Sequence, residues 1–88
     1  MKQPVPSEAT LTKQLQLHER DAMRQFYGLV AGYLTSVCSR YLTDPEDVKD
    51  VLQESFIKMF NSIDQFEFRG EGSLRAWAAR IVTNEALT

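Results

Sequence analysis

Apolar residues recur at helical spacing over most of this chain, and that periodicity constrains the fold more than any other feature. Between positions 23 and 41 they stand three or four residues apart: Met23, Phe26, Tyr27, Val30, Leu34, Val37, Cys38 and Tyr41. At about 100° per residue these positions share one face of a helix about five turns long. Asp21 precedes the pattern and is the expected N-cap of this helix.

A second helix is predicted from Pro45 to about Ser62. Asp44 can accept hydrogen bonds from the free N–H groups at a helix start, and proline suits the first helical position. One face of the segment is apolar and carries Val48, Val51, Leu52, Phe56, Met59 and Ile63. Glu54 and Lys58 lie one turn apart, so we expect them to form an ion pair.

Two shorter helices are predicted toward the ends of the chain. Ser7 can cap a helix that reaches about position 18 and carries Leu11 and Leu15 on its apolar side. Ser73 can cap a last helix whose inward residues are Leu74, Trp77, Ala78 and Ile81. No segment shows the alternation of a strand, so the expected fold class is all-α, a compact bundle of three to four helices.

Composition limits the class of protein. A chain of 88 residues makes one domain, no apolar run approaches the roughly 18 residues of a membrane helix, and the N-terminus lacks a signal-peptide core. We therefore expect a cytoplasmic protein that does not bind a membrane. Cys38 is the only cysteine, which excludes an internal disulfide, and His18 is the only histidine. No zinc spacing, phosphate loop or nucleophile motif is present, so we predict no enzyme, no catalytic residue, no metal and no cofactor.

Acidic and basic side chains are segregated along the chain. The net charge is −2, which alone argues against nucleic acid. Acids dominate residues 43–68, however, and three arginines follow within residues 69–80. An acidic segment followed by a basic one indicates two different partners, and the alternative is a set of solvated helix faces.

The acids of the second predicted helix gather on its outer face. Asp50, Gln53 and Glu54 lie opposite the apolar stripe, and Ile57 lies among them although it points at water. An apolar centre with a charged rim is typical of a small protein interface, here for a basic partner. A solvated face with one isolated isoleucine is an equal alternative.

The loop and last helix combine aromatic and basic side chains. The candidate contact residues are Phe66, Phe68, Arg69, Arg75, Arg80 and Asn84. The phenylalanines can stack on an unpaired base and the arginines can contact phosphates, a combination that suits single-stranded nucleic acid. The asparagine can read a base edge. In the alternative, the phenylalanines close the core and the arginines are solvated; Trp77 is expected in the core.

Two motifs in this order point to a family. Asp50, Gln53, Glu54 and Phe56 spell D-x-x-Q-E-x-F, and residues 68–77 precede Arg80, Ile81 and Asn84. Together they resemble conserved region 2 of the sigma-70 superfamily, in its extracytoplasmic-function (ECF) branch of RNA polymerase sigma factors. The resemblance begins near position 21. We therefore divide the chain into an N-terminal arm with a short helix (1–20), loose over residues 1–6, and a region 2 domain (21–88).

The resemblance implies a transcription initiation factor domain with two binding surfaces. The surface expected to dock on the coiled coil of the polymerase β′ clamp comprises Asp47, Asp50, Gln53, Glu54 and Ile57. The surface expected to recognise and melt the promoter minus-ten element comprises Phe66, Phe68, Arg69, Gly70, Ser73, Arg75, Arg80 and Asn84. One non-template base would be flipped into a pocket near Phe68 and Asn84. An anti-sigma factor is a further expected partner.

A second function is also compatible with these residues. A sigma-like helical module can bind polymerase or an anti-sigma factor without binding DNA. Relatives continue into region 4, a helix-turn-helix domain that this chain lacks, so we expect a fragment that does not initiate transcription efficiently alone. If three arginines contact phosphates of a single strand, log affinity should fall with log salt at a slope of roughly −2.

Overall fold

The computed structural model describes residues 7–88, so the segment 1–6, expected to be loose, lies outside the described residues. The helices, in chain order, are α1 (Glu8–Gln16), α2 (Arg20–Cys38), α3 (Pro45–Ser62) and α4 (Ser73–Ala86), with a 3-10 turn, η1 (Ile63–Gln65), directly after α3. No strand occurs within residues 7–88. The prediction of an all-α bundle of three to four helices is confirmed.

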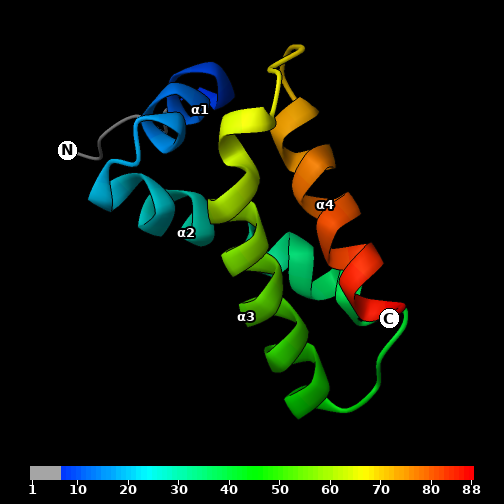
Figure 1. Cartoon of the computed structure of the whole chain (residues 1–88). Coiled ribbons are helices and arrows are strands. Elements are labelled where there is room, and N and C mark those ends of the chain that lie inside the picture. The colour runs from blue at the N-terminus through cyan, green and yellow to red at the C-terminus, as the bar shows by residue number, and fades with distance from the viewer. Residues whose placement is uncertain (1–6) are drawn as a thin grey trace, which may run out of the picture.

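The helices cross rather than running parallel to one another. In Figure 1, α3 runs down the middle of the molecule with α4 beside it, and α2 passes behind α3 toward the C-terminal end of α4. Helix α1 packs on α2 and on η1 at the other end of the molecule. The turn η1 and the loop that follows it therefore lie between α1 and the start of α4.

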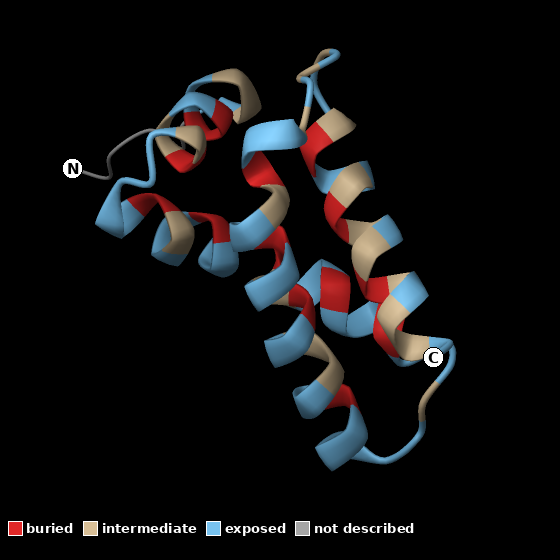
Figure 2. Cartoon of the chain, in the orientation of Figure 1, coloured by how far each residue is buried: buried red, intermediate tan, exposed pale blue. Residues whose placement is uncertain are grey.

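The core follows the apolar stripes of the sequence. Figure 2 shows buried residues on all four helices. The largest side chains that are fully buried are Phe26, Leu11, Leu34, Met59, Leu74 and Val82. The predicted stripe of α2 is buried except at its edges, where Tyr27 and Tyr41 remain about half exposed. Tyr41 lies beyond the end of α2 at Cys38, so its position no longer follows the helical period.

Two buried polar side chains lie outside the apolar pattern, and each donates a hydrogen bond to a backbone carbonyl one turn earlier. Thr12 of α1 is buried, and its hydroxyl donates to the carbonyl of Glu8 at 2.7 Å. Ser55 of α3 is fully buried, and its hydroxyl donates to the carbonyl of Val51 at 2.7 Å. That hydrogen bond removes most of the cost of burying the hydroxyl, since the oxygen atom is not left unpaired. Cys38 is buried as expected, and burial raises the pKa of its thiol.

The start of each helix tests the capping predictions. Ser7 and Asp44 cap α1 and α3 as predicted: Ser7 Oγ accepts from the amide of Thr10, and Asp44 Oδ1 accepts from the amide of Glu46 at 2.9 Å. The prediction for Asp21 is wrong, because α2 begins at Arg20. Asp21 therefore lies in the first turn, where its negative charge interacts favourably with the positive end of the helix dipole.

Across residues 7–88, none of the helices combines the length and the hydrophobicity that a membrane crossing requires.

Candidate functional site

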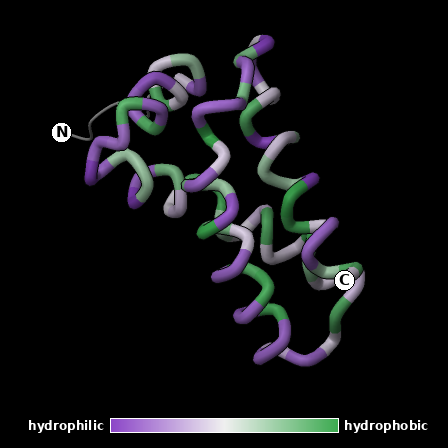
Figure 3. Tube along the Cα trace, viewed as in Figure 1, coloured by the Kyte–Doolittle hydropathy of each residue, from purple (hydrophilic) through white to green (hydrophobic). Residues whose placement is uncertain are grey.

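The predicted acidic face lies along the outer side of α3, and we call it the acidic row. It comprises Asp47, Asp50, Gln53, Glu54 and Ile57, all of them exposed. Its members are spaced by helical repeats, so their side chains project from one side of a regular helix. Ile57 exposes 55% of its surface among these polar groups. Hydrophilic and hydrophobic residues alternate along the α3 trace in Figure 3, as expected of an amphipathic helix.

The carboxylates of the acidic row have no basic partner among the described residues. The ion pairs within residues 7–88 join His18 to Asp64, Lys58 to Glu85 and Arg69 to Glu67. The predicted pair between Glu54 and Lys58 does not form, because the Lys58 ammonium donates to the Glu85 carboxylate of α4 instead. This hydrogen bond to Glu85, followed by the attraction of the nearby carboxylates, raises the pKa of Lys58. The charge of Glu54 therefore faces solvent without an ion-pair partner.

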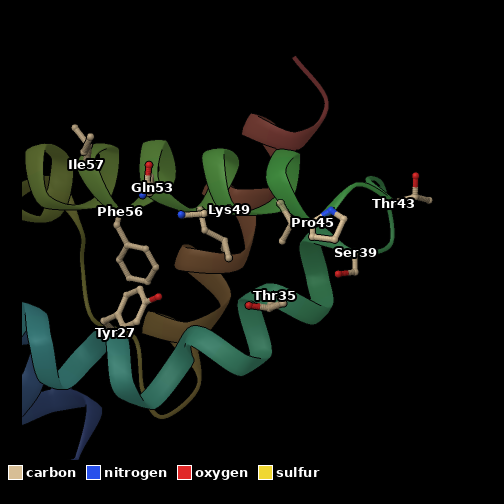
Figure 4. A pocket seen from close by; sticks show the side chains of 11 residues that line it. Tyr27, Thr35, Ser39, Thr43, Pro45, Lys49, Gln53, Phe56 and Ile57 are labelled. Carbon is tan, nitrogen blue, oxygen red and sulfur yellow. The ribbon is translucent and has the colours of Figure 1, made fainter.

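A groove of about 730 Å³ lies between α2 and α3 beside the acidic row. Tyr27 of α2 and Phe56 of α3 meet across it with ring centroids 4.9 Å apart, as Figure 4 shows. Gln53 and Ile57 line its α3 side. The acidic row is thus continuous with an apolar groove, which extends the apolar contact area around Ile57.

The loop between η1 and α4 is shaped by two glycines. Gly70 and Gly72 adopt φ values of 113° and 93°, which side chains disfavour. Ser73 closes the loop on itself, because its hydroxyl donates to the Gly70 carbonyl at 2.6 Å and accepts from the Arg69 amide at 3.1 Å. The prediction that Ser73 is the N-cap of α4 is therefore wrong: Ser73 is the first helical residue, and Gly72 occupies the cap position.

A side chain from the other end of the sequence supplies the missing cap. Glu8 Oε1 accepts from the amide of Gly72 at 2.9 Å and from that of Leu74 at 3.0 Å. In return, the Glu8 amide donates to Glu71 Oε1 at 3.2 Å. No local sequence pattern predicts this contact, because the partners lie more than sixty positions apart.

A hollow of about 530 Å³ opens beside this loop, and we call it the arginine hollow. It is lined by Gln65, Phe66, Glu67, Arg69, Ser73, Ala76, Trp77 and Arg80. The rings of Phe66 and Trp77 contact each other with centroids 5.1 Å apart and also pack on the core. Sequence reasoning placed Trp77 in the core alone; its position three residues before Arg80, on the same side of the helix, was the available signal.

The structure does not bring all the predicted DNA-binding residues into this hollow. The guanidinium of Arg75 instead lies 5.7 Å from the ring centroid of Tyr33, on α2. Asn84 lines a different hollow, together with Lys58 and Ile81, about 16 Å along α4 from Ser73. Phe68 is half-buried but does not line the arginine hollow. A single pocket formed by Phe68 and Asn84 is thus not present in this conformation.

Metal-ligand chemistry has no visible basis in the described part of the chain. No group of three or more histidine, cysteine, aspartate or glutamate side chains gathers there as metal ligands would. His18 lies 3.2 Å from the Asp64 carboxylate and packs edge-on against the ring of Phe60.

The model of the family Sigma-70 region 2 matches residues 26–88 of this chain. The chain belongs to this family. The ECF RNA polymerase sigma-E factor of Haemophilus influenzae is 44% identical over 62 residues, which is 70% of this chain and 29% of that protein. The factor of the same name from Salmonella typhimurium is 38% identical over 71 residues, which is 77% of this chain and 36% of that protein. This region 2 chain thus spans about a third of the length of these curated relatives.

A solved structure agrees with the family assignment. The NMR structure of an engineered region 2 of sigmaE in complex with GTAAAA superimposes with a TM-score of 0.83 at 28% identity, over 98% of this chain and 87% of that one. The predicted membership in the ECF branch of the sigma-70 superfamily is confirmed. Region 2 is a transcription factor domain and not a known enzyme family. The family match begins at Phe26, so Glu8 and the rest of α1 lie outside it.

Proposed function

We propose that this region 2 domain binds RNA polymerase core through the acidic row and holds the non-template strand of the promoter minus-ten element in the arginine hollow. The observation that carries the proposal is the separation of the two surfaces. Carboxylates without ion-pair partners line α3 on the N-terminal side of Ile57, whereas aromatic rings and two arginines line the hollow beside α4. Opposite charge patterns on one domain fit one basic protein partner and one polyanion.

The acidic row has the chemistry of a docking surface for the coiled coil of the β′ clamp. Ile57 and the adjoining groove offer an apolar contact area, and Asp47, Asp50 and Glu54 extend from it as exposed charges toward the start of α3. An apolar centre supplies most of the affinity of such an interface, while a charged rim steers and orients the partner. Because α3 is a regular helix, it presents these groups at fixed spacing.

The arginine hollow has the chemistry of a single-strand site. Phe66 and Trp77 offer ring faces on which a base can stack, and Arg69 and Arg80 can contact the flanking phosphates. Stacking is worth about 1–3 kcal/mol per base, and flipping a base from the duplex costs a few kcal/mol. The stacking and the phosphate contacts together can therefore offset extraction, and promoter melting follows because the opened state gains population.

The remaining residues predicted to contact DNA lie at or beyond the edges of the arginine hollow. Gly70 and Ser73 shape the loop, Phe68 lies within it, and Asn84 can reach only a nucleotide further along α4. In this arrangement Phe66 and Trp77, in place of Phe68 and Asn84, hold the flipped base.

A second candidate is a protein-binding module that docks on polymerase or on an anti-sigma factor without DNA. One observation favours it: the Glu67 carboxylate lies 3.4 Å from the Arg69 guanidinium at the rim of the hollow. Both side chains are 79% exposed, so this pair is weak and a phosphate can replace the carboxylate. The DNA-binding function is therefore the better supported of the two.

Calorimetric titration of the chain with the isolated β′ clamp coiled coil tests the docking function. We expect saturable binding by the parent and its loss in an Asp50→Lys, Glu54→Lys double variant that keeps its helical circular dichroism. A well-folded parent that does not bind would contradict the proposed polymerase role.

Fluorescence anisotropy with a labelled single strand containing GTAAAA, the sequence bound by the sigmaE neighbour, tests the DNA function. Two phosphate contacts, from Arg69 and Arg80, predict a slope of log affinity against log salt of about −1.4, and a contribution from Arg75 would bring it to about −2. Absence of binding, or a flat salt response, would favour the protein-binding module.

A further inference from the structure

Helix α1 contacts both ends of the loop that borders the arginine hollow. At one end, the Gln16 side-chain amide donates to the carbonyls of Ile63 at 3.1 Å and Phe66 at 2.8 Å. At the other end, the Glu8 carboxylate accepts from the amides of Gly72 and Leu74. The loop of residues 66–72 has no regular structure of its own, so these hydrogen bonds fix where it begins and where it ends.

The geometry of α1 makes it a rigid spacer between these two contacts. Glu8 and Gln16 are eight residues apart in one helix, which separates them by about 12 Å along its axis. Between them, Leu11 and Leu15 are almost fully buried and anchor the helix to the core. The distance between the ends of the loop is thus set by an element that does not itself line the arginine hollow.

We propose that α1 positions the loop of residues 66–72 for single-strand binding, with Glu8 and Gln16 as positioning residues. This inference rests on the proposed DNA function and adds to it a segment outside the family match, which begins at Phe26. A loop already held in its binding conformation loses less conformational freedom when the strand binds, so affinity rises without any new contact to DNA.

The Glu8 carboxylate occupies a place where a phosphate could also bind, because backbone amides at the start of a helix bind phosphate groups. A carboxylate on the amides of Gly72 and Leu74 can act in two opposite ways. It can hold the loop in shape, in which case its removal weakens DNA binding. It can instead occupy the place of a phosphate, in which case its removal strengthens DNA binding. The reciprocal hydrogen bond from the Glu8 amide to the Glu71 carboxylate favours the first, since it adds a second link between the start of α1 and the loop.

The test compares Glu8→Ala with Glu8→Gln and a matched control, using the whole chain and the labelled GTAAAA strand. Glu8→Ala removes the acceptor, whereas Glu8→Gln keeps an acceptor oxygen and loses only the charge. Glu19→Ala removes the same charge from an exposed residue whose side chain makes no capping hydrogen bond. Hydrogen exchange of the Gly72 and Leu74 amides follows the contact itself.

We expect Glu8→Ala to weaken single-strand binding about three- to tenfold and to speed exchange at Gly72 and Leu74, with clamp binding unchanged. Glu8→Gln should recover the parent affinity to within about twofold, a rescue that general destabilisation would not produce. Glu19→Ala should match the parent. Equal or tighter binding by a folded Glu8→Ala variant would overturn the inference while leaving the proposed DNA function intact. A parent that binds no single strand would overturn both.

Gln16→Ala provides an independent test at the other end of the loop, and it carries the inference if Glu8→Ala does not fold. We expect a loss of affinity in the same direction. Because one released end already frees the loop, the Glu8→Ala, Gln16→Ala double variant should lose less affinity than the product of the two single losses. Fully multiplicative losses would show that the two contacts act separately and would overturn the spacer role of α1.

Discussion

The acidic row and the arginine hollow differ in how much of the chain is needed to build them. The acidic row occupies eleven consecutive positions of α3, and a regular helix alone sets its spacing. The arginine hollow combines η1, a loop and α4, and its loop is held by Glu8, which lies 66 residues from Leu74. A surface on one helix depends on local structure, whereas a surface on a loop depends on whatever fixes that loop.

The acidic row and the arginine hollow should therefore respond differently to amino-acid substitutions. Substitutions on the acidic row should affect one partner and little else, because the side chains are exposed and have no ion-pair partner among the described residues. Substitutions far from the arginine hollow should still alter it, provided that they release the loop. Four variants or pairs of variants can break or sharpen this contrast.

The largest effect is expected for Ile57→Ala. Removing the apolar centre of the acidic row should weaken clamp binding by about 2 kcal/mol, roughly thirtyfold. Single-strand binding and the thermal midpoint should stay close to parental, because Ile57 is 55% exposed and packs little. Leu17→Ala is the matched control, at an apolar residue that is 73% exposed in the turn after α1. Equal losses in both variants would show that Ile57 is not a specific contact.

Arg80→Ala and Arg75→Ala should separate the arginines of the last helix. Arg80 lines the arginine hollow, so its loss should lower single-strand affinity about fivefold and make the salt slope shallower by about 0.7. Arg75 lies over Tyr33, so its loss should leave the slope unchanged and cost about 0.5 kcal/mol of stability. Fluorescence anisotropy at several salt concentrations measures the slope for each variant. A shallower slope in Arg75→Ala would show that Arg75 also contacts a phosphate.

Gly72→Ala and Gly32→Ala should change stability in opposite directions. Gly72 has a φ of 93°, so alanine there should destabilise the fold by about 1 kcal/mol and weaken single-strand binding by disturbing the loop. Gly32 lies in α2 with open space around it, so alanine should stabilise by about 0.5–1 kcal/mol. Urea denaturation measures both, and a neutral Gly72→Ala would show that the loop accommodates another conformation.

The smallest effect is expected for Lys58→Met, which removes the ion pair between α3 and α4. The folded-state pKa of Lys58 is raised, so the stabilisation is fully present below the unfolded pKa of about 10.4 and is lost as pH rises through the folded value. The difference in free energy of unfolding between parent and variant should therefore be constant from neutral pH to about pH 10 and shrink above it. A difference that shrinks between pH 7 and 9 would contradict this assignment.

Local features of the fold could be predicted from the sequence because their causes are local. The stripes of α2 and α3 follow the helical period, and Asp44 and Pro45 mark the start of α3 within two residues. The acidic row could be identified for the same reason, as a second face of a helix whose first face is apolar. Its binding role stays a prediction until the clamp titration is done.

The wrong predictions all involve partners that are distant in sequence or alternatives of similar energy. Lys58 binds Glu85 rather than Glu54, and Glu8 rather than Ser73 caps α4, because the folded chain brings these groups together. Helix α2 starts before Asp21, where neighbouring residues can serve as caps at nearly equal cost. Trp77 packs on the core as expected, and its second role in lining the arginine hollow was indicated only by its spacing from Arg80.

The hydrogen bonds between Glu8 and the start of α4 also bear on the order of folding. They join residues 63 to 66 positions apart, about three quarters of the length of the chain. Closing so long a segment is entropically costly, so such contacts form after local helices and after collapse of the core. We therefore expect α3 to gain protection early and the Gly72 and Leu74 amides to gain it last. Pulse-labelling hydrogen exchange during refolding can measure this order, and early protection at Gly72 would contradict it. A chain emerging from the ribosome would thus carry the helix of the acidic row before it carries the shaped loop beside the arginine hollow.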